Sequence, residues 1–567
     1  MLGSLSFVRR LYDTLRTFSP FERLLLYVFS ALLALSAGWM LVALSNTFSV
    51  QVPARGGSFT EGAVGTARFV NPLLATSQAD HDLTALVYSG LMRQNGGEFT
   101  PDLAESYTVS DDGTEYTFRL REATFQDGAP VTAEDVAFTI ALAQDPAIKS
   151  ARRANWEGVQ VSVEDAHTVH FKLPNAYAPF IGNTTLGILP KHLWENIPTD
   201  EFSFDALNTA PIGSGPFKVR DVSFDSAGAP TEYVLESFRH FALGTPHLRR
   251  IIYRLYSNEG ALYDAYRAHE IDSFLSLSPK TLPTDVADAA HLVELPLTRV
   301  FAVFFNQNHA PVLANTVARQ ALSVGVDREM LIDTVLGGFG EPLSGPIPPD
   351  VFTPATTTPS DESNPAAILS AGGWRLETAS STEAQNTWIA GESRLSFALA
   401  TADTPELVET AQLVVDGWRS LGIDVKLETY SLSDFNQTIL RPRAYDAILF
   451  GKVLTRPLDP FAFWHSSQRN DPGLNLALYA NADADRLLTE ARSETDTTER
   501  RALYDEFVAT VAEDAPAVFL YAPSAVYAAP AHITNITRTS VTLPAERFLS
   551  VHTWYRDTEQ VWQFFTK

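Results

Sequence analysis

A run of 21 residues without a charged side chain, Leu24 to Leu44, constrains this chain more than any other feature of its sequence. As an α-helix the run would be about 31 Å long at ~1.5 Å per residue, which matches the hydrocarbon core of a bilayer. Four arginines precede the run, against two acidic residues. The positive-inside rule therefore places the N-terminus in the cytoplasm and the main body outside. We predict a cytoplasmic or interfacial segment over residues 1–23 and a single transmembrane helix over residues 24–44.

The same run is also compatible with a secretory signal peptide, because Ala43-Leu44-Ser45 is an acceptable cleavage sequence. The apolar region of such a signal is only ~7–15 residues long, so we favour a retained anchor in the cell membrane. Residues 45–56 contain Ser, Pro and Gly with little periodicity, and we interpret them as a short tether. The sequence leaves open whether the helix is retained or cleaved.

Composition excludes several functions for the rest of the chain. The sequence contains no cysteine, which rules out a disulfide, a thiolate nucleophile, a Cys-rich zinc site and a lipid anchor on cysteine. Its formal net charge is −25, so a nucleic-acid partner is not expected.

The body alternates strands and helices. Residues 105–110 and 115–121 alternate apolar and polar side chains around a turn sequence, which predicts a β-hairpin. A helical stripe from Leu407 to Leu421 ends at a glycine and leads into an alternating segment, which predicts a helix followed by a strand. Residues 346–364, rich in Pro, Ser and Thr, predict a surface loop. Together these patterns indicate mixed α/β lobes without internal repeats.

Common catalytic motifs are missing from the sequence, including the P-loop, H-E-x-x-H and G-x-S-x-G patterns. Gly213-Ser214-Gly215 lacks the spacing of a nucleophile elbow, so we interpret it as a tight backbone turn. His240 and His247 have no third metal ligand nearby in the sequence. We therefore expect no catalytic residue, no metal, no cofactor and no enzymatic activity.

A long stretch of the body resembles a known family. LAESYTVSDDGTEYTFRLREATFQDGAPVTAEDVAFTI, Leu103 to Ile140, is similar to the signature of family 5 extracellular solute-binding proteins, the receptors of oligopeptide, dipeptide and related ABC importers. The resemblance continues, in the family's order, in PIGSGPFKV (211–219), AYRAHEIDSF (265–274), the segment 304–349, AGGWRL (371–376), GWRSLGIDVKLETY (417–430), YDAILFGK (445–452) and DPFAFWHSSQ (459–468). It covers essentially residues 57–567.

The resemblance implies a two-lobed, periplasmic-binding-protein-like α/β fold with an extra third domain. Lobe I would comprise residues 57–95, 205–300 and 523–567, the extra domain residues 96–204, and lobe II residues 301–522. The implied function is capture of a solute, foremost a peptide, between the lobes and its delivery to the permease subunits of an ABC transporter by a monomeric receptor. The alternative is a membrane-anchored sensor or enzyme that reuses the fold, which would need a partner-docking face or a convergent nucleophile and base.

The resemblance also assigns candidate ligand-binding residues. In relatives an extended segment after an Asn/Asp-Pro pair lines the cleft, which here corresponds to Thr76, Ser77 and Gln78; its backbone would pair with an extended ligand. The strand that crosses into the second lobe contributes Arg299 and Phe301, where Arg299 either binds a carboxylate or forms a surface ion pair.

The loop after YDAILF faces the ligand in relatives. We expect Gly451 to let the ligand approach the backbone closely. Peptide receptors commonly place an Asp four residues later to bind the ligand's α-ammonium, whereas this chain has Thr455, followed by Arg456. Together with Lys452, Arg456 would make the site basic, which favours an anionic or N-terminally blocked ligand. The alternative is that Arg456 points to solvent and Asp459 takes over the anchoring role.

Overall fold

The computed structural model describes residues 17–96, 98–349, 351–352, 364–377, 386–562 and 564. Most of the segment expected over residues 1–23, and most of the loop expected over 346–364, lie outside the described residues. The chain divides into two compact units, Gly56–Trp554 and a smaller unit made of Met1–Arg55 with Tyr555–Lys567.

The smaller unit contains the apolar run. Helix α2 (Pro20–Phe48) begins at Ser19, whose hydroxyl accepts a hydrogen bond from the Glu22 N–H while the Glu22 carboxylate accepts one from the Ser19 N–H. Its stretch Pro20–Ser45 is 26 residues long and contains an 18-residue stretch with a mean hydropathy of 2.1, so it is long and apolar enough to cross a membrane. The helix therefore includes the predicted span and extends beyond both of its ends.

The residues after this helix correct the prediction of a loose tether. Strand β1 (Ser49–Pro53) pairs antiparallel with strand β23 (Thr558–Trp562), with Ser49 opposite Trp562 and Pro53 opposite Thr558. The C-terminal strand Thr558–Trp562 thus belongs to the smaller unit and not to lobe I as expected, because its backbone pairs with β1. A partner separated by some 500 residues of chain is invisible to local sequence patterns.

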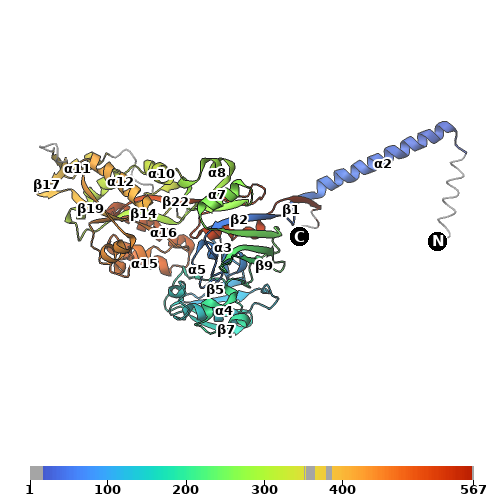
Figure 1. Cartoon of the computed structure of the whole chain (residues 1–567), viewed down its shortest axis with the longest axis horizontal. Helices are drawn as coiled ribbons and strands as arrows, with labels where there is room; N and C mark the ends of the chain where they lie inside the picture. The colour runs from blue at the N-terminus through green and yellow to red at the C-terminus, as the bar shows by residue number, and fades with distance from the viewer. Residues whose placement is uncertain are drawn as a thin grey trace. The chain divides into compact units, whose positions relative to one another are not determined.

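The large unit is built on a twelve-stranded sheet with the order β20-β19-β21-β14-β22-β12-β2-β11-β10-β9, to which β13 and β15 add through β22. Its strands are β2 (Ser58–Val64), β9 (Phe217–Phe224), β10 (Pro230–Ser237), β11 (Arg250–Tyr256), β12 (Ser273–Ser276), β13 (His291–Pro296), β14 (Arg299–Phe305), β15 (Gly340–Pro342), β19 (Ser396–Ala402), β20 (Asp424–Tyr430), β21 (Ala447–Val453) and β22 (Ala517–Ala529). The fully buried β22 runs through the middle of this unit, where it joins two halves of the sheet (Figure 1).

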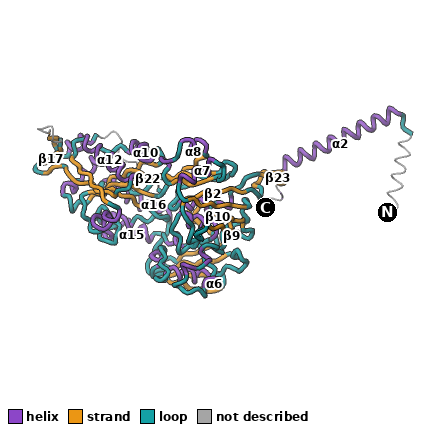
Figure 2. Tube along the Cα trace, viewed as in Figure 1, coloured by secondary structure: helices purple, strands orange, loops and turns teal. Residues whose placement is uncertain are grey.

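Two large hydrophobic cores lie on either side of this junction. The first core collects buried residues between Phe59 and Leu297 and again from Ala525 to Trp554. The second core collects buried residues from Val300 to Ala522. Helices and strands alternate in both halves, which confirms the mixed α/β fold predicted from the sequence (Figure 2).

The second core is covered by α9 (Thr316–Val324), α10 (Arg328–Leu336), α12 (Pro405–Ser420), α15 (Ala482–Ser493) and α16 (Thr497–Asp514). The predicted helix over 407–421 is confirmed as α12, whose buried stripe includes Val414 and Trp418. Gly422 follows it with φ = +80°, a conformation that favours glycine, and the chain then enters β20.

A separate four-stranded sheet, β5-β6-β8-β7, packs with α4 onto the first core (Figure 1). Its elements are β5 (Ala104–Val109), β6 (Glu115–Leu120), α4 (Ala133–Gln144), β7 (Gln160–Asp165) and β8 (Thr168–Lys172). Strands β5 and β6 form the predicted hairpin.

The remaining described elements are α3 (Gln78–Val87), β3 (Met92–Asn95), β4 (Glu98–Pro101), α5 (Phe180–Asn183), α6 (Lys191–Trp194), α7 (Glu259–Arg267), α8 (Thr284–Ala289), α11 (Pro365–Ala371), β16 (Arg375–Glu377), β17 (Thr387–Ala390), β18 (Ser393–Arg394), α13 (Leu432–Asp434), α14 (Phe461–Trp464) and a π-helix (Phe435–Leu440). Several short 3₁₀ helices connect them, among them η8 (Pro544–Phe548).

Candidate functional site

The chain passes from one core to the other at two adjacent places. Leu297 belongs to the first core and Val300 to the second, while β22 passes from the second core at Ala522 to the first at Ala525. Thr298 lies at the first crossing, where its carbonyl accepts a hydrogen bond from the Leu454 N–H at 2.8 Å. The start of β14 and the segment after β21 are thus held together at the boundary between the cores.

Arg299 begins β14 at this boundary. It is half-buried, and burial lowers the pKa of its guanidinium while the Glu406 carboxylate opposes the shift. Its Nε is buried and has no hydrogen-bond partner among the described residues. Burial in turn raises the pKa of Glu406, which accepts a hydrogen bond from the Tyr521 hydroxyl at 3.4 Å. The surroundings of Arg299 are therefore those of a half-buried charge and not of an ordinary surface ion pair.

Phe301 and Gly451 are opposite one another on β14 and β21. The Phe301 ring stacks on Tyr521 with ring centroids 5.1 Å apart. A Cβ at Gly451 would come within 2.8 Å of the Phe301 ring. The space above Gly451 is therefore filled by Phe301, which corrects the expectation that glycine is needed there for a ligand.

Lys452 points into the second core, with 6% of the residue exposed. Its Nζ lies 4.1 Å from the ring centroid of Phe304 and 5.0 Å from that of Trp464. Burial holds the pKa of the Lys452 ammonium well below its usual range. Lys452 therefore does not contribute to a basic surface with Arg456, contrary to the prediction.

Thr455 and Arg456 follow β21 at the boundary, the former exposed and the latter half-buried. Arg456 acts on a residue that the sequence reasoning missed, the half-buried Glu546 in η8. Burial raises the pKa of Glu546 to about 7, against hydrogen bonds from backbone N–H groups of residues 542–543 and the charges of Arg456 and Arg152. Arginines from two distant segments therefore act on one carboxyl beside the crossing.

A cavity of about 100 Å³ adjoins this carboxyl and is also lined by residues 537–541. That volume is below the ~300–1,000 Å³ typical of pockets for small-molecule ligands.

Asp459 is engaged by other side chains, which argues against its role as a ligand anchor. Arg492 donates from Nε to both carboxylate oxygens at 3.0 Å and from Nη2 at 2.7 Å. The Tyr177 hydroxyl donates to the same carboxylate at 3.1 Å, and the Ala178 N–H donates to the Arg492 carbonyl at 2.7 Å. Asp459 thus links the second core to the segment around Tyr177.

The segment Thr76 to Gln78 forms the N-terminus of α3. The Ser77 hydroxyl accepts a hydrogen bond from the Asp80 N–H at 3.0 Å, while the Asp80 carboxylate accepts from the Ser77 and Thr76 N–H groups at 3.0 and 3.3 Å. Gln78 is already helical. The N–H groups of Thr76 and Ser77 are both engaged by Asp80, so their backbone is not placed to pair with a ligand as expected, although Thr76 is exposed.

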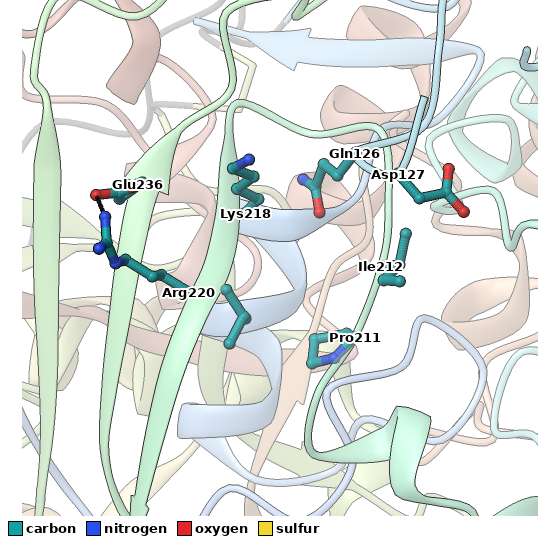
Figure 3. A pocket seen from close by; sticks show the side chains of 8 residues that line it. Gln126, Asp127, Pro211, Ile212, Lys218, Arg220 and Glu236 are labelled. Carbon is teal, nitrogen blue, oxygen red and sulfur yellow. Dashed lines mark hydrogen bonds and ion pairs between the residues drawn. The ribbon is translucent and has the colours of Figure 1, made fainter. Parts of the chain in front are cut away.

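A second cavity, of about 360 Å³, lies elsewhere on the first half of the large unit. Figure 3 shows Arg220 paired with Glu236, and the side chains of Lys218 and Gln126 beside one another. None of the predicted ligand-binding residues lines it. In the described part of the chain no cluster of three or more His, Asp or Glu residues is placed to hold a metal ion.

Gly213 and Gly215 lie close to this cavity along the chain and have a structural role. A Cβ at either position would clash with the carbonyl of Val87. The Gly-Ser-Gly sequence was predicted to be a tight backbone turn; the structure shows that glycine is needed here because the Val87 backbone comes close.

Comparison with protein families decides the identity of this fold. Residues 98–475, more than half of the chain, match the model described as bacterial extracellular solute-binding proteins, family 5. The chain belongs to this family.

Curated relatives of this family 5 protein are similar along most of their length. The oligopeptide-binding protein AppA of Bacillus subtilis is 28% identical over 489 residues, which cover 83% of this chain and 87% of AppA. A protein of Escherichia coli K12, described as a probable D,D-dipeptide-binding periplasmic protein, DdpA, is 27% identical over 484 residues, covering 81% and 87% of the two chains.

Solved structures show the same fold. AppA from Bacillus subtilis in complex with a nonapeptide superposes with a TM-score of 0.63 at 26% identity, covering 89% of this family 5 protein and 100% of the AppA chain. The periplasmic murein tripeptide-binding protein MppA, in its unliganded open form, superposes with a TM-score of 0.72 at 21% identity, covering 90% and 99%.

Proposed function

We propose that this family 5 protein is a membrane-anchored, extracytoplasmic receptor that captures a peptide between two lobes and delivers it to an ABC permease. The observation that carries the proposal is the boundary between the two cores, where half-buried charged residues from both halves converge beside two chain crossings. The similarity to AppA, whose solved complex contains a nonapeptide, supports a peptide as the ligand. We assign residues 57–300 with 523–554 to lobe I and its extra domain, and residues 301–522 to lobe II.

The ligand side of the boundary would be formed by Thr76, Arg299, Thr455 and Arg456, with Phe301 providing apolar contact. Arg299 and Arg456 are half-buried cations. Thr455 is exposed and has no carboxylate to offer an α-ammonium group. We therefore favour a ligand that presents carboxylates, which guanidinium groups can bind in bidentate fashion. Gly451 and Lys452 have no direct part in this site.

Retention of the N-terminal helix fits the same function. The potential cleavage sequence Ala43-Leu44-Ser45 lies inside α2, and the Ser45 hydroxyl accepts a hydrogen bond from the Trp562 indole N–H at 3.3 Å. We place the N-terminus in the cytoplasm and the body outside, as a single-pass monomer. Membrane fractionation and N-terminal sequencing test this: a mature chain that starts near Asn46 would contradict it.

The ligand is tested by native mass spectrometry of the full chain purified from its membrane. We expect a bound mass that fragments as one or more peptides. Titration calorimetry should then show that peptides rich in Asp or Glu bind more tightly than neutral peptides of equal length. A co-purified non-peptide solute, or equal binding of both peptide sets, would refute the respective part of the proposal.

A further inference from the structure

The C-terminal strand β23 lies against the residues that leave the apolar helix. No charged residue occurs between Arg23 and Arg55, so the whole of β1 is uncharged. In β23 the only charged residue is Glu559, opposite Val52 in the half of the ribbon farther from the helix. The two-stranded ribbon formed by β1 and β23 is therefore least polar where it meets α2.

Aromatic side chains collect at that end of the ribbon. Trp562 pairs with Ser49, the first residue after α2, and is 47% exposed. Phe48, the last residue of α2, is 52% exposed, and Phe564 is 86% exposed. The hydrogen bond from the Trp562 indole to Ser45 fixes the indole one residue beyond the end of the apolar run Leu24–Leu44. Interfacial aromatic residues are typically found at this depth of a membrane protein.

The dimensions agree with this placement. The headgroup region of a bilayer is ~5–7 Å deep on each side, the difference between a core of ~30 Å and a bilayer of ~40–45 Å. Glu559 is three residues from Trp562 along an extended strand, or about 10 Å at ~3.3 Å per residue. With Trp562 in the headgroup region, the carboxylate of Glu559 would remain in water.

We propose that β23 is a second membrane contact: Trp562 and Phe564 insert into the outer headgroup region beside α2, so that both ends of the chain are attached to the same membrane. This inference rests on the proposed membrane span of α2. Two chain connections, Arg55–Gly56 and Trp554–Tyr555, then join the anchor to the large unit. A receptor attached in this way stays at the membrane surface that carries its permease.

The absence of native cysteine allows single reporters to be placed in the full chain. The variants Phe564→Cys, Thr558→Cys and Leu35→Cys are each labelled with a small fluorophore and reconstituted into vesicles of phosphatidylethanolamine and phosphatidylglycerol without any permease. Quenching is measured with nitroxide lipids labelled at the headgroup or in the acyl chain, and with aqueous iodide. We expect the label at 564 to be quenched by headgroup nitroxide, the label at 558 by iodide, and the label at 35 by acyl-chain nitroxide.

The role of the indole is tested in the Phe564→Cys background. Trp562→Ser should reduce the headgroup quenching at position 564 and increase its quenching by iodide, whereas Trp562→Tyr should retain the wild-type pattern. Phe204, 85% exposed in the large unit, provides the matched control Phe204→Ser, which should change nothing.

Equal iodide quenching at 564 and 558, with lipid quenching retained at 35, overturns the second contact and leaves the anchor intact. Loss of lipid quenching at 35 overturns the membrane span and this inference together. Protection of position 564 that appears only after a permease is added would show a protein partner instead of lipid, and would also overturn the inference.

Discussion

Tyr177→Phe removes a single hydrogen bond between the proposed extra domain and the proposed lobe II. The hydroxyl of Tyr177 donates to the Asp459 carboxylate at 3.1 Å. Arg492 keeps its own hydrogen bonds to Asp459, and its guanidinium stays over the Tyr177 ring at 5.3 Å from the centroid. The substitution therefore changes the contact between the domains without leaving a buried charge uncompensated.

The expected loss of free energy depends on the charge of the acceptor, the Asp459 carboxylate. A hydrogen bond to a charged group contributes ~1.5–3 kcal/mol to stability. Because Arg492 already neutralises Asp459, we take the lower end, about 1.5 kcal/mol. If lobe II and the extra domain come together only when the ligand binds, the hydrogen bond forms in the complex and contributes its free energy to binding. The dissociation constant of the ligand should then rise about tenfold.

Titration calorimetry with the co-purified ligand measures this change, and Tyr107→Phe on exposed strand β5 serves as the matched control. Unchanged affinity with a lower melting temperature would mean that the contact is present in the free protein too. Unchanged affinity and unchanged melting temperature together would refute the reasoning, because the hydrogen bond would then contribute nothing in solution.

Four further substitutions test the packing around the boundary between the two cores by thermal and urea unfolding. Gly451→Ala should destabilise lobe II by ~1–3 kcal/mol because its Cβ would displace the Phe301 ring, whereas Gly417→Ala within helix α12 should stabilise it by up to ~1 kcal/mol. Lys452→Met should stabilise the protein at neutral pH, because it removes a buried ammonium group. With Lys452 present, the unfolded chain binds a proton that the folded chain has lost at any pH between the lowered pKa of the folded state and 10.5, so the free energy of unfolding rises with pH over that range. This pH dependence should disappear in the variant. Arg547→Met should destabilise lobe I by ~3–5 kcal/mol, because two buried carboxylates lose their cation.

Local signals were sufficient to predict much of the fold. The helix α12 could be located because Pro405 lies at its first turn and Gly422 ends it, while its buried stripe has helical spacing. The hairpin of β5 and β6 follows from alternation and turn residues that are adjacent in sequence. In both cases the physical cause acts within a few residues, so the sequence carries it directly.

The side chains whose positions were predicted wrongly are placed by interactions between segments that are distant in sequence. Strand β21 begins with an apolar run, Ala447 to Phe450, whose side chains are buried on both faces of the sheet. Lys452 lies two residues after Phe450, so its side chain is on the same face and is also buried. That run was a usable signal for burial of Lys452. Nothing local indicates that Phe301 would fill the space over Gly451, or that Glu546 would come under the influence of Arg456, because both depend on strand pairing and crossings fixed by the whole fold.

The neighbouring residues Glu546 and Arg547 connect the stability of lobe I to the charges at the proposed site. Arg547 is fully buried, and its guanidinium binds both Glu61 on β2 and Asp82 on α3 at 2.7–2.9 Å. These bonds fix the short helix η8, and thereby the carboxyl of Glu546 next to it. Glu546 is thereby held where the charges of Arg456 and Arg152 act on it. The electrostatics of the boundary between the lobes thus depend on a buried ion network inside one lobe, so a change in that network should alter ligand affinity as well as stability.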